Sequence, residues 1–113
     1  MSQNNRRNER VTCGARSGAE GPRGPVTGIC RNISQGGMFF LGPTLPVGGR
    51  FEFWIELPKG KVVTMGEVHY AHEYPEGGGI GVHFTRLTQE GVAVLEDFIA
   101  SAPDTIRTTR RSD

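Results

Sequence analysis

Residues 50–57 read RFEFWIEL, and this segment decides the fold class. Its side chains alternate with a period of two, with one face made of Phe51, Phe53, Ile55 and Leu57. The opposite face carries Glu52, Trp54 and Glu56. Successive side chains of a strand point to opposite faces, so this pattern predicts a half-buried β-strand. A turn at 58–61 then predicts a hairpin with residues 62–74, which are expected to bend at Gly66.

The segments around this hairpin predict further short strands. Apolar or alternating stretches at 11–16, 26–33 and 38–41 each fit one strand, and Ile80, Val82 and Phe84 mark a last one. Glycine, proline and small polar residues separate them. They predict loops at 17–25 (SGAEGPRGP) and 42–49 (GPTLPVGG), and turns at 34–37 and 77–79.

One helix is expected over about residues 88–102. Its apolar positions follow helical spacing, at Val92, Leu95, Phe98, Ile99 and Ala102. Thr88 can cap its start, and Pro103 follows its end. Five or six short strands and one helix predict an all-β fold, a small antiparallel barrel with the helix on one opening. Side chains fill a barrel of this size, so a ligand is expected on its outer surface or rim.

The charge is unevenly distributed along the 113 residues. Residues 1–31 carry six arginines against Glu9 and Glu20, a net charge of +4. Residues 32–103 carry four basic and eight acidic side chains, a net charge of -4. The chain therefore divides into a flexible basic arm at 1–10, a folded domain at 11–103 and a disordered polar tail at 104–113. A basic arm on an acidic body indicates an anionic partner for the arm.

Several classes of protein do not fit the sequence. No apolar stretch approaches the roughly 18 residues of a membrane span, and the first residues lack the apolar core of a signal peptide. A cytoplasmic protein without membrane insertion is expected. Cys13 and Cys30 fit no redox or zinc spacing and are expected to be thiols in strands. The histidine spacing favours no metal site, and no nucleophile or acid–base set indicates an enzyme.

Arg6 and Arg10 form the spacing Arg-x-x-x-Arg, with Arg7 between them. A guanidinium group is planar and always charged. It can bind phosphate oxygens or the O6 and N7 edge of guanine in a fork, and it can stack on a purine ring. Taken alone, however, such a segment is more typical of a solvated terminal tail.

A second motif, Asn-x-Ser-x-x-Gly, begins 22 residues after Arg10, at Asn32. The Asn32 carbonyl can accept from the N1–H or N2 amine of guanine, with the Ser34 hydroxyl beside it. Gly36 and Gly37 leave the backbone open to a ligand. The same residues taken alone also fit a plain turn.

The two motifs together, on a small barrel, resemble the PilZ domain family. Three further segments are similar to that family: GMFF at 37–40, LPVGG at 45–49 and IGVHF at 80–84. The resemblance covers about residues 6–101. It implies a six-stranded antiparallel split β-barrel with a C-terminal helix, and a bacterial, non-catalytic receptor for cyclic di-GMP. The implied binding residues are Arg6, Arg7, Arg10, Asn32, Ser34, Gly36 and Gly37.

The resemblance implies no cofactor other than this ligand, and Asn32 replaces the more common Asp of the motif. It leaves open whether one nucleotide or an intercalated pair binds. We expect the ligand to draw the arm onto the barrel and so to act on a protein partner in motility, attachment or polysaccharide output. One alternative is an adaptor domain that binds a protein partner without nucleotide. The other, a barrel that binds RNA or single strands, would need aromatic side chains on a basic sheet face.

Overall fold

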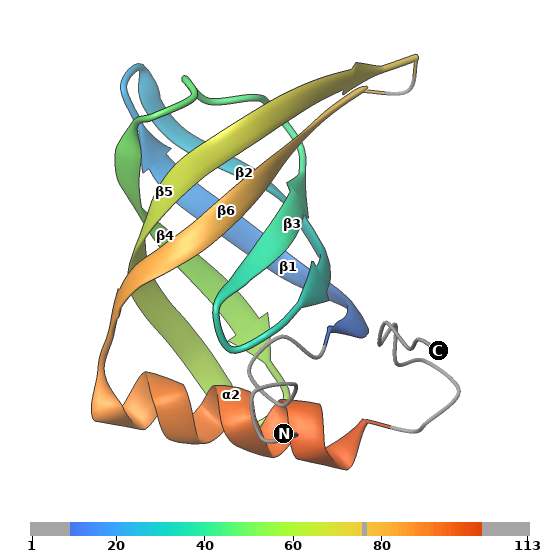
Figure 1. Cartoon of the computed structure of the whole chain (residues 1–113), viewed down its shortest axis with the longest axis vertical. Coiled ribbons are helices and arrows are strands. Elements are labelled where there is room, and N and C mark those ends of the chain that lie inside the picture. Colours follow the sequence, from blue (N-terminus) through green and yellow to red (C-terminus); the bar gives the residue numbers. More distant parts are fainter. Residues whose placement is uncertain (1–9, 76, 103–113) are drawn as a thin grey trace, which may run out of the picture.

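The computed structural model describes residues 10–75 and 77–102, and this part of the chain forms six strands and one helix (Figure 1). The strands are β1 (Val11–Gly21), β2 (Gly24–Ile33), β3 (Gly37–Leu41), β4 (Arg50–Leu57), β5 (Gly60–Tyr74) and β6 (Gly77–Leu87), and helix α2 (Gln89–Ser101) follows them. The expected arm, apart from Arg10, and the expected tail lie outside the described residues.

The six strands close into a barrel in the order β1-β2-β3-β6-β5-β4. Every neighbouring pair is antiparallel, including β1 with β4, whose pairing from Ser17↔Ile55 to Ala19↔Phe53 closes the sheet. The prediction of a six-stranded antiparallel barrel followed by one helix is therefore confirmed.

The alternation in β4 places its two faces as expected. Phe53 and Ile55 are fully buried in the barrel, and the Phe53 ring meets that of Phe40 edge to face at 6.3 Å between centroids. Trp54 faces outward, where Arg16 and Lys61 lie 5.6 and 5.3 Å from its ring centroid. The indole therefore covers the seam between β1 and β4 and is flanked by two cations.

The expected loop at residues 17–25 is wrong, because β1 continues to Gly21 and only Pro22 and Arg23 make the turn into β2. The small residues here are packing residues. A side chain at Gly18 would come within 2.5 Å of the Trp54 ring, and one at Gly28 within 2.1 Å of the Leu41 carbonyl. Close approach between strands thus explains Gly18, which was interpreted as a loop residue.

The expected turn at 77–79 is also wrong, because these glycines begin β6 and pair with β5 from Tyr74↔Gly77 onward. At Gly66, where a bend was expected, the β5–β6 register shifts, and Thr85 of β6 is the extra residue. A side chain at Gly66 would come within 2.5 Å of Val82, so the glycine lets the strands pack closely at this point.

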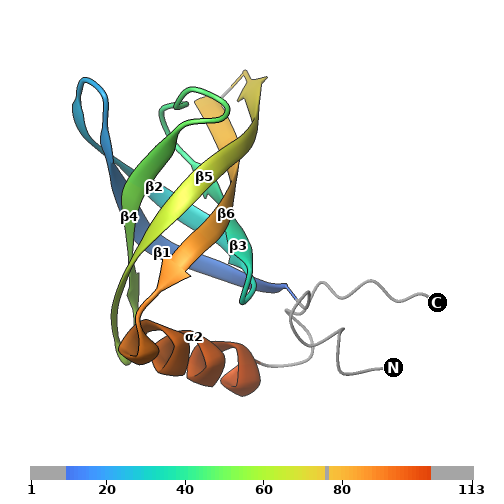
Figure 2. The same ribbon diagram turned by 60° about the vertical axis from the view of Figure 1, so that its left-hand side comes forward.

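Helix α2 lies across one end of the barrel, as Figure 1 and Figure 2 show from two directions. The Thr88 hydroxyl caps it by accepting a hydrogen bond from the Gly91 N–H at 2.9 Å. Leu95 and Ile99 are buried with the barrel core. The predicted helix and its cap are confirmed, and the helix closes this opening with apolar side chains.

Replacing Phe53 by alanine should lower the free energy of unfolding by about 3–5 kcal/mol, because it removes a fully buried ring from the centre of the barrel. Val47, which is 61% exposed, offers a control. The free energy of unfolding of its alanine variant should stay within about 0.5 kcal/mol of the wild-type value. Urea denaturation followed by circular dichroism measures both values, and equal losses would contradict this account of the core.

Candidate functional site

The site begins where the β1–β2 pair changes register. Residues Ala15↔Cys30 and Thr12↔Asn32 are paired, which leaves two residues of β1 opposite one, Arg31, of β2. Against β3 the extra residue lies in β2 itself, because Cys30 pairs with Phe40 and Asn32 with Phe39, which leaves Arg31 between them. In a regular strand, Cys30 and Ile33 would face opposite sides. The extra residue lets both lie fully buried and turns Asn32 to the outer face of the barrel.

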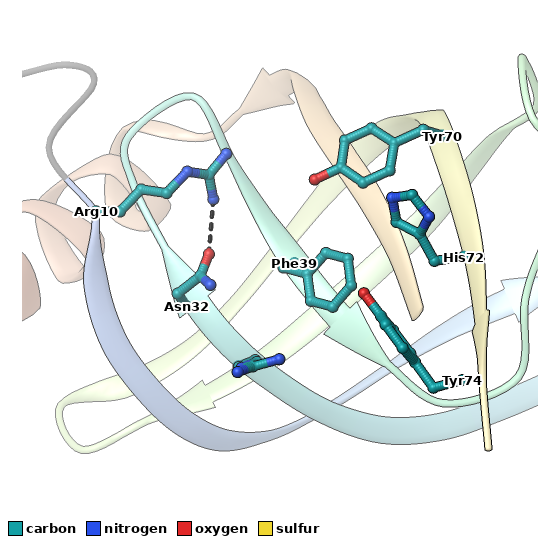
Figure 3. A pocket seen from close by; sticks show the side chains of 7 residues that line it. Arg10, Asn32, Phe39, Tyr70, His72 and Tyr74 are labelled. Carbon is teal, nitrogen blue, oxygen red and sulfur yellow. Dashed lines mark hydrogen bonds between the residues drawn. The ribbon is translucent and has the colours of Figure 1, made fainter. Parts of the chain in front are cut away.

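Arg10 and Asn32 meet at this bulge. The Arg10 guanidinium donates from Nη1 to the Asn32 Oδ1 at 2.8 Å, across 22 positions of sequence (Figure 3). Both residues are partly buried. One residue from each sequence motif therefore sits at the same point of the barrel wall. Arg6 and Arg7 lie outside the described residues.

Ser34 shapes the turn between β2 and β3. It is only 4% exposed, and its hydroxyl donates to the Gly37 carbonyl at 3.4 Å and accepts from the Gly36 N–H at 3.2 Å. The Ser34 N–H also donates to the Gly37 carbonyl, at 2.8 Å. In this arrangement the hydroxyl holds the backbone of the motif rather than facing outward.

The two glycines of the motif differ in their surroundings. A side chain at Gly37 would come within 2.2 Å of the Val82 carbonyl, so this glycine is needed for β3 to pair closely with β6. A side chain at Gly36 would meet nothing within 4 Å. Of the two, only Gly36 therefore has open space beside it for a ligand.

A groove of about 410 Å³ lies on the outer face beside this pair. It is lined by Arg10, Arg31, Asn32, Phe39, Tyr70, His72 and Tyr74. In Figure 3 the four aromatic side chains gather on one side of the groove and the Arg10–Asn32 pair on the other. None of the seven lining residues is acidic, although residues 32–103 carry eight acidic side chains against four basic ones.

Sequence reasoning missed the aromatic side of the groove. Tyr70, His72 and Tyr74 alternate along β5, and the hairpin register pairs them with Gly81, Gly79 and Gly77 of β6. From the other side, Phe39 of β3 also pairs with Gly81. The alternating aromatic residues of β5 and the alternating glycines of β6 are visible in the sequence and could have indicated this face. Only the strand register shows that the two sets pair with each other.

The glycines of β6 make room for the rings. A side chain at Gly81 would come within 2.2 Å of the Tyr70 ring, and one at Gly79 within 2.5 Å of the Phe39 ring. The Phe39 and Tyr70 rings lie 6.2 Å apart with 24° between their planes. Aromatic rings therefore lie directly over the backbone of β6, on the outside of the barrel.

The two cysteines lie next to this bulge, and both are free thiols. A hydrogen bond from Cys30 lowers the pKa of Cys13, although partial burial opposes this shift. The same contact and burial raise the pKa of Cys30, which is fully buried. Cys13 is therefore the thiol that ionises more readily.

The described part of the chain contains neither a metal-ligand cluster nor a membrane-spanning helix. The His69 and His83 rings stack at 5.1 Å, but residues 10–75 and 77–102 contain no cluster of three or more potential metal ligands. Over the same residues, no helix is long and apolar enough to cross a membrane.

The groove offers a defined set of interactions. Arg10 and Arg31 supply positive charge for an anion, and the Asn32 amide can donate or accept hydrogen bonds at a base edge. The aromatic rings offer flat apolar faces. Together these groups suit a planar, negatively charged ligand such as a nucleotide.

Comparison with solved structures finds the same fold at low sequence identity. The PilZ domain of YcgR from Escherichia coli with c-di-GMP superposes with a TM-score of 0.70 and 15% identity, over 82% of this chain and 87% of that one. The inhibitor of motility MotI/DgrA from Bacillus subtilis gives a TM-score of 0.71 and 14% identity, over 80% of this chain and 47% of that one.

YcgR from Escherichia coli in complex with c-di-GMP gives a TM-score of 0.68 and 16% identity, over 81% of this chain and 43% of that one. The chain thus spans less than half the length of MotI/DgrA and of this YcgR chain. No curated protein sequence matches it. The family model for the PilZ domain matches residues 4–101. The chain therefore belongs to the PilZ domain family.

Proposed function

We propose that this domain is a bacterial, cytoplasmic, non-catalytic receptor for cyclic di-GMP that acts on a protein partner. The observation that carries the proposal is the 2.8 Å hydrogen bond between Arg10 and Asn32, which joins the two sequence motifs beside an arginine-bearing groove. The binding set we propose is Arg6, Arg7, Arg10, Asn32, Ser34, Gly36 and Gly37.

The roles within this set are not equal. Arg10 faces the groove and would bind a phosphate or a guanine edge. Asn32 Oδ1 has two lone pairs, so it can accept from guanine N1–H as well as from Arg10. Ser34 and Gly37 would act indirectly, because their contacts hold the turn and the β3–β6 pairing.

The names of the similar structures support the choice of ligand and output. Two of them are YcgR structures with c-di-GMP, and MotI/DgrA is named as an inhibitor of motility. By analogy, the output of this domain would be motility, attachment or polysaccharide production, and the binding of cyclic di-GMP would be its input.

The mechanism we propose is closure of the basic arm on the barrel. Arg6 and Arg7 would join Arg10 around the anionic ligand, so that the ligand links residues 1–10 to the groove. Ordering each residue of the arm costs about 1–2 kcal/mol, and charge-assisted contacts and stacking must exceed this cost. Micromolar affinity, about -8 kcal/mol, is the expected result.

Isothermal calorimetry with cyclic di-GMP tests the proposal. Arg10→Ala should weaken binding roughly 10- to 100-fold, because it removes a charge-assisted contact. Arg23→Ala is the matched control, since Arg23 is an exposed arginine in the turn at the far end of the β1–β2 hairpin. It should bind as the wild type does.

Two results would reject the proposal. Folded wild-type protein that binds no cyclic di-GMP at low salt would favour the adaptor that acts without nucleotide. Equal losses of affinity for cyclic di-GMP in the Arg10 and Arg23 variants would show that binding depends only on the overall charge, as on a solvated basic surface.

The Ser34→Ala substitution tests whether Ser34 affects binding indirectly, by holding the turn, or by direct contact with the ligand. The alanine would lose the two hydroxyl hydrogen bonds that hold the turn, each worth about 1 kcal/mol. We expect weaker binding together with a lower free energy of unfolding, whereas Arg10→Ala should weaken binding with little loss of stability. Parallel calorimetry and urea denaturation measure both quantities, and weaker binding by Ser34→Ala at unchanged stability would instead indicate direct ligand contact.

A further inference from the structure

Cys13 of β1 and Cys30 of β2 are in contact across the hairpin, at the register shift beside the candidate site. Cys30 is fully buried in the core, and Cys13 is partly buried and packs against the same core. A hydrogen bond joins the two thiols, and both cysteines are free. Two thiols in direct contact on neighbouring strands need little movement to form a disulfide.

The two thiols differ in access and in reactivity. Cys13 is followed by Gly14, which is exposed and has open space where a side chain would stand. A small oxidant can therefore reach Cys13 from outside the barrel, whereas the core encloses Cys30. The contact with Cys30 lowers the pKa of Cys13, and the same contact together with burial raises the pKa of Cys30. Cys13 is thus the thiol that reacts first.

The cysteine pair also adjoins the contact between Arg10 and Asn32. The Cys30 Sγ lies 3.5 Å from the backbone carbonyl oxygen of Asn32, whose side chain accepts from Arg10 at 2.8 Å. On β1, Cys13 is three residues from Arg10. A covalent bond draws two sulfur atoms closer than thiol contact allows, so a disulfide here would shift the two strands at the bulge that orients Asn32.

We propose that Cys13 and Cys30 form a reversible disulfide on exposure to hydrogen peroxide, and that this bond breaks the contact between Arg10 and Asn32. The inference goes beyond the proposed function, because the disulfide forms without a nucleotide. In the cytoplasm, where the proposed function places the domain, thiols are kept reduced. The disulfide would therefore be transient there and would report oxidation.

The reaction takes two steps, with hydrogen peroxide as the oxidant. The Cys13 thiolate attacks a peroxide oxygen, so that an S–O bond forms, the O–O bond breaks, and the departing hydroxide takes up a proton to become water. Cys30 Sγ then attacks the sulfur of the Cys13 sulfenic acid. An S–S bond forms, the S–O bond breaks, and the hydroxide leaves as water with the proton of the Cys30 thiol. The two thiols lose two electrons in total, and one peroxide becomes two waters.

Mass spectrometry of the intact protein tests the disulfide directly. Treatment of the folded wild type with hydrogen peroxide should remove the mass of two hydrogen atoms, and dithiothreitol should restore it. Trypsin cleaves after Arg10, Arg16, Arg23 and Arg31, so the two cysteines fall in separate peptides, residues 11–16 and 24–31. Under non-reducing conditions these two peptides should be recovered as one linked species.

Nuclear magnetic resonance of the same samples tests the effect on the site without any ligand. The resonances of the Asn32 side-chain amide should shift on oxidation and return with dithiothreitol, because its carbonyl loses the hydrogen bond from Arg10. The backbone amide of Val47, in the loop between β3 and β4, is the reference and should not move.

The Cys13→Ser variant is the matched control. Under the same peroxide treatment it should form no linked peptide and show no shift at Asn32. It also reports any oxidation of methionine, which dithiothreitol does not reverse. Circular dichroism of the variant and of the oxidised wild type confirms that folded barrels are compared.

Three results would overturn the inference. The first is that Cys13 stays a thiol in the folded wild type or oxidises only to sulfinic acid. The second is a disulfide that links two molecules through Cys13. The third is an internal disulfide that leaves the Asn32 side-chain amide unchanged.

Calorimetry connects this disulfide to the proposed function. The oxidised wild type should bind cyclic di-GMP roughly 10-fold more weakly than the reduced protein, and the Cys13→Ser variant should bind equally well with and without peroxide. Reduced protein that binds no cyclic di-GMP would reject the proposed function, whereas the peptide linkage and the Asn32 shift would still support the disulfide.

Discussion

The register shifts on the two sides of β2 are the constraint on which the site depends. Cys30 and Ile33 are three residues apart and both belong to the core, and β2 contains an extra residue between them relative to β3. That residue is Arg31, and its insertion turns Asn32 outward, toward Arg10 at the start of β1. A β-bulge on a barrel wall thus keeps the interior filled and, by the same local change, places two polar side chains on the outer face. The turn that follows is held by the Ser34 hydroxyl, so the motif position is set by internal contacts.

The glycines of β6 allow the aromatic rings to pack on the opposite side of the groove. β6 carries glycines at every second position from Gly77 to Gly81, and the neighbouring strands carry aromatic residues that fold over them. Rings can lie this close to a strand only where no side chain stands between them. The result is a row of rings outside the barrel whose apolar interior is already filled by other residues, such as Phe40 and Phe53.

The charge of the side chains that line the groove indicates which ligands it can bind. Residues 32–103 carry eight acidic and four basic side chains, yet the groove is lined by two arginines and by no carboxylate. Arg10, which directly precedes β1, lines the groove. An anionic ligand in the groove would be attracted by these two arginines, with no carboxylate of the lining to oppose it.

The sequence by itself determined the barrel class, the β4–β5 hairpin and the helix with its cap at Thr88, because these depend on local periodicity and on turn and cap chemistry. It misassigned residues 17–25 and 77–79, since local propensity interprets glycine as a turn residue, whereas Gly18 and Gly79 make room for the rings of Trp54 and Phe39 on strands distant in the chain. Only the tertiary structure decided that Asn32 faces Arg10, that Ser34 is buried, and that Tyr70 lies over Gly81. Each of these depends on strand register and bulges, and a shift of one residue would send a side chain to the opposite face.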